Sequence, residues 1–171
     1  MPRYVAFLRG VMPTNAKMAD LRRCFESAGF TDARTVRSSG NVVFDASSRS
    51  EAAITRRAEA AMSEQLGRTF YTIVRPVSHL RTLLKADPYA EYPSPPNSKR
   101  IVTFLRDPVE KRPSLPLGVD GARILALEGR EVFSTYVPDP RGPSFMVLLE
   151  KTFGTNITTR TWETVQKCAV A

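Results

Sequence analysis

The sequence predicts an α+β protein, in which a ferredoxin-like βαββαβ subdomain is followed by a smaller α+β subdomain. Apolar residues in the first half alternate between the spacing of strands and the spacing of helices, in the order of the ferredoxin-like unit. Ten of the 13 prolines lie between residues 88 and 143, so the second half must consist of short elements joined by loops. A chain of 171 residues is long enough for two small domains, and we place them at residues 1–76 and 77–171.

The first half contains six predicted elements. Helices are expected where apolar residues recur at helical spacing and a glycine stops the pattern, at 18–28 and 50–67. Strands are expected at the short apolar runs between them, at 3–9, 33–37, 41–46 and 69–75. In this topology the first and third strands lie side by side at the centre of the sheet. The helices cover one face of the sheet, and we expect the other face to stay available.

The second half is less regular, and residues 92–98 (YPSPPNS) form a candidate linker. We expect a helix at 77–85, a strand at 100–106 and a hairpin formed by 123–127 and 130–137 around a Glu-Gly turn. A helical stripe that begins at Phe145 ends at Gly154. Thr161 can cap a last helix with Trp162 facing inward.

The formal net charge of +8 favours anionic partners such as nucleic acids. The charge is spread along the chain: residues 1–76 carry 12 basic and 7 acidic side chains, and residues 77–171 carry 13 and 10. Nowhere do four basic residues follow one another. A diffusely basic surface without a specific partner is therefore the simpler alternative.

Several classes of protein do not fit the composition. No apolar run approaches the roughly 18 residues of a membrane helix, and the apolar stretch 4–8 is shorter than the roughly 7–15 residues of a signal-peptide core. We therefore expect a cytoplasmic protein without membrane partners. Two distant cysteines, Cys24 and Cys168, and the single histidine, His79, provide no metal-ligand spacing. We expect no metal and no cofactor, although the absence of the usual catalytic motifs does not exclude an enzyme.

The stretch RSSGNVVFDA at 37–46 half-fits the signature of an RNA-reading strand. The two positions that should carry base-stacking rings hold Ser39 and Asn41, so the part of the motif that binds is missing. Packing of Val42 and Phe44 against the two helices explains their identity without RNA. The Gly-Asn pair at 40–41 is then either a hairpin turn or part of a polar pocket at a strand end.

Three segments together resemble the bacterial domain-of-unknown-function family 1697: YVAFLRG at 4–10, MADLRRCFESAGFTDARTVRSSGNVVF at 18–44 and LEKTFGTNITTRTWETVQK at 149–167. The resemblance implies two α+β subdomains, the first of them ferredoxin-like, and brings no established activity. The sequence departs from the family pattern after the first strand. Gly10 is followed by VMPTNAK in place of a glycine-rich loop, and Pro13 removes one backbone donor from that loop.

The resemblance also selects candidate site residues. The positions that match the family motifs are Arg9, Gly10, Ser39, Gly40, Asn41, Lys151, Thr159, Arg160 and Trp162. We expect ligand binding at these positions except Trp162, centred on a polar cluster of Arg9, Asn41 and Arg160. Two guanidinium groups and an amide suit a phosphate or a carboxylate. Alternatively, Arg9 and Arg160 join the two subdomains through salt bridges, and Trp162 belongs to the core.

Three functions remain open at this point. The leading hypothesis is a non-enzymatic binding protein for an anionic ligand, either a nucleic acid or a phosphorylated small molecule. The second is an enzyme that anchors an anionic substrate in a polar pocket between the subdomains. The third is a protein–protein interaction module that pairs through an open sheet face or sheet edge.

Overall fold

The structure is a computed structural model that describes residues 1–119, 121–138 and 144–171. The chain divides into two compact units. The first unit comprises residues 1–85 together with 166–171, and the second comprises residues 86–165. The C-terminal residues are held in the first unit by two arginines: Arg3 Nε donates to the Ala171 carbonyl and Arg81 Nε to the Ala169 carbonyl, both over 3.0 Å.

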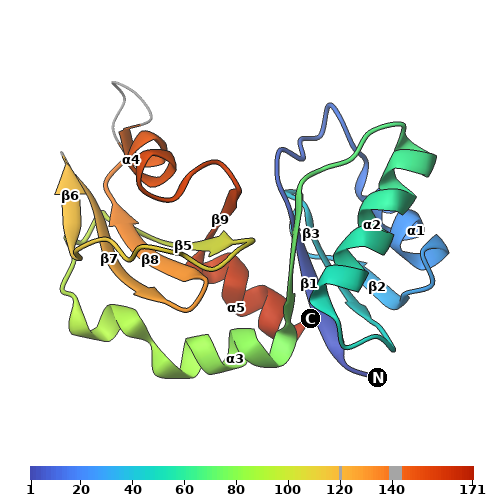
Figure 1. Cartoon of the computed structure of the whole chain (residues 1–171), viewed down its shortest axis with the longest axis horizontal. Coiled ribbons are helices and arrows are strands. Elements are labelled where there is room, and N and C mark those ends of the chain that lie inside the picture. Colours follow the sequence, from blue (N-terminus) through green and yellow to red (C-terminus); the bar gives the residue numbers. More distant parts are fainter. Residues whose placement is uncertain (120, 139–143) are drawn as a thin grey trace. The chain divides into compact units, whose positions relative to one another are not determined.

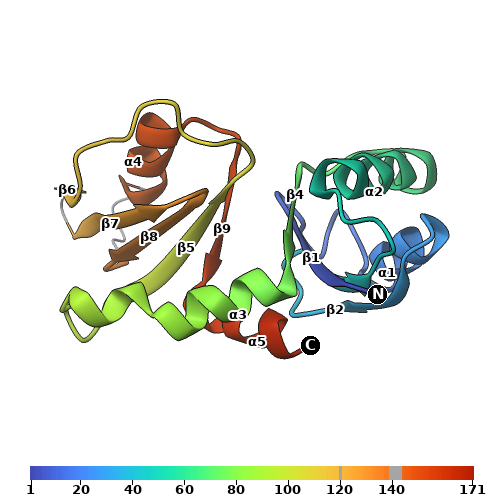
Figure 2. The same cartoon turned by 60° about the horizontal axis from the view of Figure 1, so that its bottom comes forward.

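The first unit is an α+β fold with the predicted ferredoxin-like order (Figures 1 and 2). Its elements are β1 (Arg3–Leu8), α1 (Met18–Ser27), β2 (Thr31–Thr35), β3 (Asn41–Asp45), α2 (Glu51–Leu66), β4 (Thr72–Pro76) and α3 (Val77–Ala86). The four strands form one antiparallel sheet in the order β2-β3-β1-β4. The prediction that the first and third strands lie together at the centre is therefore confirmed.

Two strands of the first unit, β2 and β4, differ from their predicted bounds by two residues or more. β2 begins and ends two residues earlier than predicted, because the chain already turns at Val36, whose N–H donates to the Asn41 carbonyl over 2.9 Å. Arg37 follows with a positive φ of 58°, which a strand does not allow. β4 begins at Thr72 and not at residue 69, because residues 67–71 form the connection from α2.

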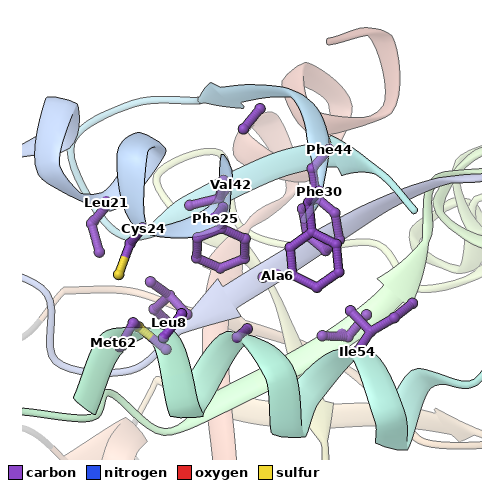
Figure 3. Packing of buried hydrophobic residues seen from close by; sticks show 14 of the residues in the cluster. Ala6, Leu8, Leu21, Cys24, Phe25, Phe30, Val42, Phe44, Ile54 and Met62 are labelled. Carbon is purple, nitrogen blue, oxygen red and sulfur yellow. The ribbon is translucent and has the colours of Figure 1, made fainter. Parts of the chain in front are cut away.

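The core of the first unit lies between its sheet and the helices α1 and α2 (Figure 3). Phe44 is fully buried there, and its ring centroid lies 5.2 Å from that of Phe25 and 4.5 Å from that of Phe30. Val42 belongs to the same cluster. Their packing against the helices explains these two side chains, as expected from the sequence, without an RNA-reading role.

The expectation that the second face of this sheet stays open is wrong. Val5, Phe7 and Val43 alternate with the core residues of β1 and β3, and each is 0% exposed. Both alternating sets of side chains on these strands are apolar, as is typical of a sheet that is covered on both faces. Arg75 on β4 is buried as well, with its Nη1 atom 3.5 Å from Oε1 of Glu51.

The second unit is a five-stranded sheet with one helix packed on it. Its elements are η1 (Pro88–Glu91), β5 (Lys99–Leu105), β6 (Leu117–Val119), β7 (Ala122–Glu128), β8 (Glu131–Tyr136), α4 (Ser144–Phe153), β9 (Ile157–Thr161) and the first residues of α5 (Trp162–Val170). The strand order is β6-β7-β8-β5-β9. The predicted hairpin is β7-β8, and the predicted helix after residue 144 is α4. The strands β6 and β9 were not predicted.

On the sheet face opposite α4, the second unit is packed with aromatic side chains. Trp162 is 8% exposed and its ring meets that of Tyr89 edge to face, with 5.1 Å between the centroids. Phe133 packs edge to face on both rings. The hydroxyl of Tyr89 donates to the Ile101 carbonyl over 2.5 Å. The prediction that Trp162 faces inward is confirmed, and the hydroxyl of Thr161 caps the last helix by accepting from the N–H of Thr164.

We find no helix in the described ranges that has both the length and the apolar character needed to cross a membrane.

Candidate functional site

Three strand ends meet at one edge of the first unit's sheet. β1 ends there, and its antiparallel neighbours β3 and β4 begin there, with Phe7 opposite Asn41 and Leu8 opposite Thr72. The N–H of Leu8 donates to the Gly40 carbonyl over 2.8 Å, and the N–H of Arg9 donates to the Tyr71 carbonyl over 2.9 Å. These bonds place five of the predicted site residues at the same edge: Arg9, Gly10, Ser39, Gly40 and Asn41.

Gly40 permits a close approach of two loops at this edge. Its φ is +81°, and a Cβ atom at this position would lie 2.9 Å from Cγ2 of Val11 and 3.0 Å from the Leu8 carbonyl oxygen. A side chain would therefore be strained by its backbone conformation and would also collide with the strand end beside it. The glycine is required by the backbone geometry of the edge.

Asn41 closes the hairpin between β2 and β3. Its side chain is fully buried, and its Nδ2 donates to the Val36 carbonyl over 3.0 Å and to Oγ of Ser39 over 3.1 Å. An amide nitrogen carries two hydrogens, so both are used within the loop. The sequence left two interpretations of Asn41, a hairpin turn or a polar pocket, and these contacts are those of a hairpin turn. The amide nitrogen shapes the loop that presents Arg37 and Ser38 to solvent.

Asn15 organises the loop after β1, which lacks the glycines of the family pattern. Its Oδ1 accepts from the N–H of Met12 over 2.8 Å, and its Nδ2 donates to the Gly10 carbonyl over 2.9 Å. The N–H groups of Asn15 and Ala16 both donate to the Met12 carbonyl. Side-chain bonds to nearby backbone are a common way for asparagine to build a turn. Asn15 was not among the predicted site residues, although Pro-Thr-Asn at 13–15 is a turn signal.

The loops at this edge carry basic side chains and no acidic ones. We define the basic edge as residues 9–17, 36–40 and 67–71, the segments that precede or follow the strand ends (Figure 1). Its cations are Arg9, Lys17, Arg37 and Arg68. Lys17, Arg37 and Arg68 are exposed, and Arg9 is half-buried. The guanidinium carbon of Arg68 lies 4.5 Å from the centroid of the Phe70 ring, and this cation–π contact holds the arginine side chain.

The two units differ in charge. The first unit carries 15 basic and 7 acidic residues, a net charge of +8, whereas the second carries 10 of each. Basic charge is spread over both sequence halves, 1–76 and 77–171, but in the folded chain the net charge belongs to the first unit. The reason is that residues 77–85 and 166–171, which add three cations and no acid, pack with the first half.

The other predicted site residues belong to the second unit. Lys151 is exposed on α4, and Thr159 and Arg160 are half-buried neighbours on β9. Nη1 of Arg160 donates to Oγ1 of Thr158 over 2.7 Å and to the Thr159 carbonyl over 2.6 Å. The cluster of Arg9, Asn41 and Arg160 stays a prediction.

Cys24 and Tyr89 have shifted pKa values, but neither resembles an activated nucleophile. Burial raises the pKa of the Cys24 thiol, and the charge of Asp20 raises it further. Burial also raises the pKa of Tyr89 strongly. Both groups stay protonated at neutral pH, whereas an attacking thiol needs a lowered pKa. Within the part of the chain that the structure describes, no three His, Cys, Asp or Glu side chains gather in a way that could hold a metal ion.

Comparison with known proteins agrees with this architecture. Residues 1–133 match the family described as protein of unknown function (DUF1697), and the chain belongs to that family. The match includes the whole basic edge, whereas Lys151, Thr159 and Arg160 lie beyond it. No curated protein matches the chain.

A solved structure is similar over almost the whole length. It is that of the conserved bacterial protein SP0830 from Streptococcus pneumoniae, with a TM-score of 0.74 and 17% sequence identity. The similarity covers 99% of this chain and 97% of the other. At this level of identity the likeness shows that the two chains share the α+β fold.

Proposed function

We propose that this chain is a non-enzymatic cytoplasmic protein that binds a phosphate-bearing ligand at the basic edge of its first unit. The ligand is a nucleic acid or a phosphorylated small molecule. The observation that carries the proposal is the segregation of charge: the first unit holds the full net charge of +8, and the three loops of the basic edge contain four cations and no carboxylate.

The residue types at this edge suit phosphate. Arginine presents several N–H donors in a planar fork that matches two phosphate oxygens, and its charge persists at every physiological pH. The cations lie on three separate loops, which are tied to one another by the backbone bonds of Leu8 and Arg9. A ligand that spans several loops can therefore contact more than one cation without reordering the backbone.

The side chains at the base-stacking positions of the first unit's sheet determine how a nucleic acid would be held. An RNA-recognition sheet stacks bases on exposed aromatic rings, but here Ser39 and Asn41 stand at the stacking positions, and Phe7 is buried. A bound nucleic acid is therefore held through its phosphates, with little preference for base sequence. Such binding releases counterions and weakens steeply as salt is raised.

The test is fluorescence polarisation with short single-stranded RNA, single-stranded DNA and duplex DNA at about 50 and 200 mM salt, followed by thermal shift with ATP and pyrophosphate. Four phosphate contacts predict that the affinity for single strands falls by about 50-fold between the two salt concentrations. A saturable thermal shift with ATP that persists at the higher salt, without binding to nucleic acid, assigns the edge to a small molecule. The absence of binding to every probe at the lower salt contradicts the proposal.

A further inference from the structure

β6 is an outer strand of the second unit's sheet (Figure 1). It consists of three exposed residues, two of which are large and apolar: Leu117 is 37% exposed and Val119 is 47% exposed. One side of β6 is paired with β7, and among the described residues no strand pairs with its other side. An edge of this kind offers a row of backbone N–H and C=O groups to a further strand.

On one face of the sheet, the side chain of Arg123 on β7 lies beside Gly118 of β6. Arg123 lies directly opposite Gly118 in the β6-β7 register. A Cβ atom on Gly118 would lie 3.1 Å from Cγ of Arg123, so the stem of the arginine occupies the space that a side chain at 118 would need. Arg123 is exposed, and no carboxylate in residues 1–119, 121–138 or 144–171 forms an ion pair with it. Within those residues its charge is therefore not neutralised by an ion pair.

The same face is hollowed beside the arginine. A groove of about 320 Å³ is lined by Arg123 and Thr135 from the sheet, by Pro95 and Ser98 from the preceding loop, and by Gly118 at the edge itself. A polar side chain from an added strand can enter this groove next to the guanidinium group.

The opposite face of β6 is apolar. Leu117 and Val119 pair with Ile124 and Ala122, which belong to the core beneath α4. Val147, on α4, is 59% exposed. An added strand would therefore meet apolar side chains on one face and Arg123 on the other.

We propose that β6 accepts an extended acidic segment of a partner protein as an additional strand. Because side chains alternate between the faces of a strand, the segment carries an acidic residue between two apolar residues. The carboxylate pairs with Arg123, and the apolar residues pack beside Leu117 and Val119. This interaction is independent of the phosphate-binding edge of the first unit.

Charge argues against a second copy of this chain as the occupant. Two copies paired through β6 around Gly118 would place their β7 strands three strand spacings apart, about 14 Å. The two Arg123 side chains would then point toward each other on the same face. Like charges that meet across a sheet are unfavourable, whereas a glutamate at the centre of a partner strand is favourable.

The test is an NMR titration of the isotope-labelled full chain with two blocked peptides, Ser-Val-Glu-Val-Ser and Ser-Val-Gln-Val-Ser. We expect saturable shifts of the amides of Leu117–Val119, with about threefold tighter binding of the glutamate peptide, as is typical of an exposed ion pair. Arg123→Gln should abolish that preference. Lys111→Gln removes an exposed charge elsewhere in the same unit and should keep it.

Three results would overturn the proposal. One is the absence of saturable shifts at β6 with either peptide. Another is equal affinity of the unchanged chain for the two peptides, since the carboxylate would then contribute nothing. The third is a concentration-dependent dimer in sedimentation that Arg123→Gln strengthens and the glutamate peptide does not disrupt, because β6 would then serve pairing between copies.

Discussion

Replacing Lys17, Arg37 and Arg68 together with glutamine is expected to abolish most nucleic-acid binding while the fold is retained. All three side chains are exposed, so their replacement removes charge without opening the core. Each cation that no longer neutralises a phosphate should lower the slope of log K against log salt by about 0.7 for single strands, so the slope should fall by about two. The affinity at about 50 mM salt should decrease by more than about tenfold. Fluorescence polarisation over a salt series measures both quantities.

A matched variant in the second unit separates a local site from total charge. Lys99, Lys111 and Arg123 are also exposed, and their replacement by glutamine changes the net charge by the same amount. This control should bind with nearly the affinity of the unchanged chain. If the affinity of the two triple variants falls equally, binding follows the overall charge, and the basic edge has no special part in it.

Gly40→Ala is expected to destabilise the first unit, and with it the basic edge, by about 2–4 kcal/mol. The positive φ of this residue accounts for about 1–2 kcal/mol with any L side chain. The remainder comes from the contact of the new Cβ with the Leu8 carbonyl oxygen, which is backbone and cannot turn aside. The midpoint of urea unfolding, followed by circular dichroism, measures the destabilisation.

Gly10→Ala is the matched control for Gly40→Ala. Gly10 has nearly the same φ, +83°, but nothing lies within 4 Å of a Cβ at that position. Its replacement should cost only the conformational part, about 1–2 kcal/mol. Equal destabilisation by the two variants would show that the approach of the loops at Gly40 adds nothing to the stability of the edge.

The fold was largely predictable because the first half of the chain is locally consistent. Helical spacing before Gly29 and Gly67, and apolar alternation in the strands, pointed to the same topology. The strands β6 and β9 were missed for different local reasons. β6 has three residues with a central glycine, and β9 is rich in threonine and lacks apolar alternation. Pairing with β7 and β5 makes them strands, and such tertiary contacts are not visible in a local pattern.

The candidate site was predictable only in part. The family motifs identified Arg9, Gly40 and Asn41, and the structure brings these together. Lys17 and Arg68 were not identified, because each is a single cation in a loop and only the strand register shows that the loops share an edge. The segregation of charge was hidden for a similar reason, since residues 166–171 join the first unit across the whole length of the sequence.

The most direct test of the phosphate-binding edge is to map the contact itself. Amide shifts of the labelled full chain would be followed during titration with a short single-stranded RNA and, separately, with ATP, at about 50 mM salt. The proposed function predicts that the largest shifts fall on residues 9–17, 36–40 and 67–71. Shifts confined to the second unit, or no shifts with either ligand, would contradict it.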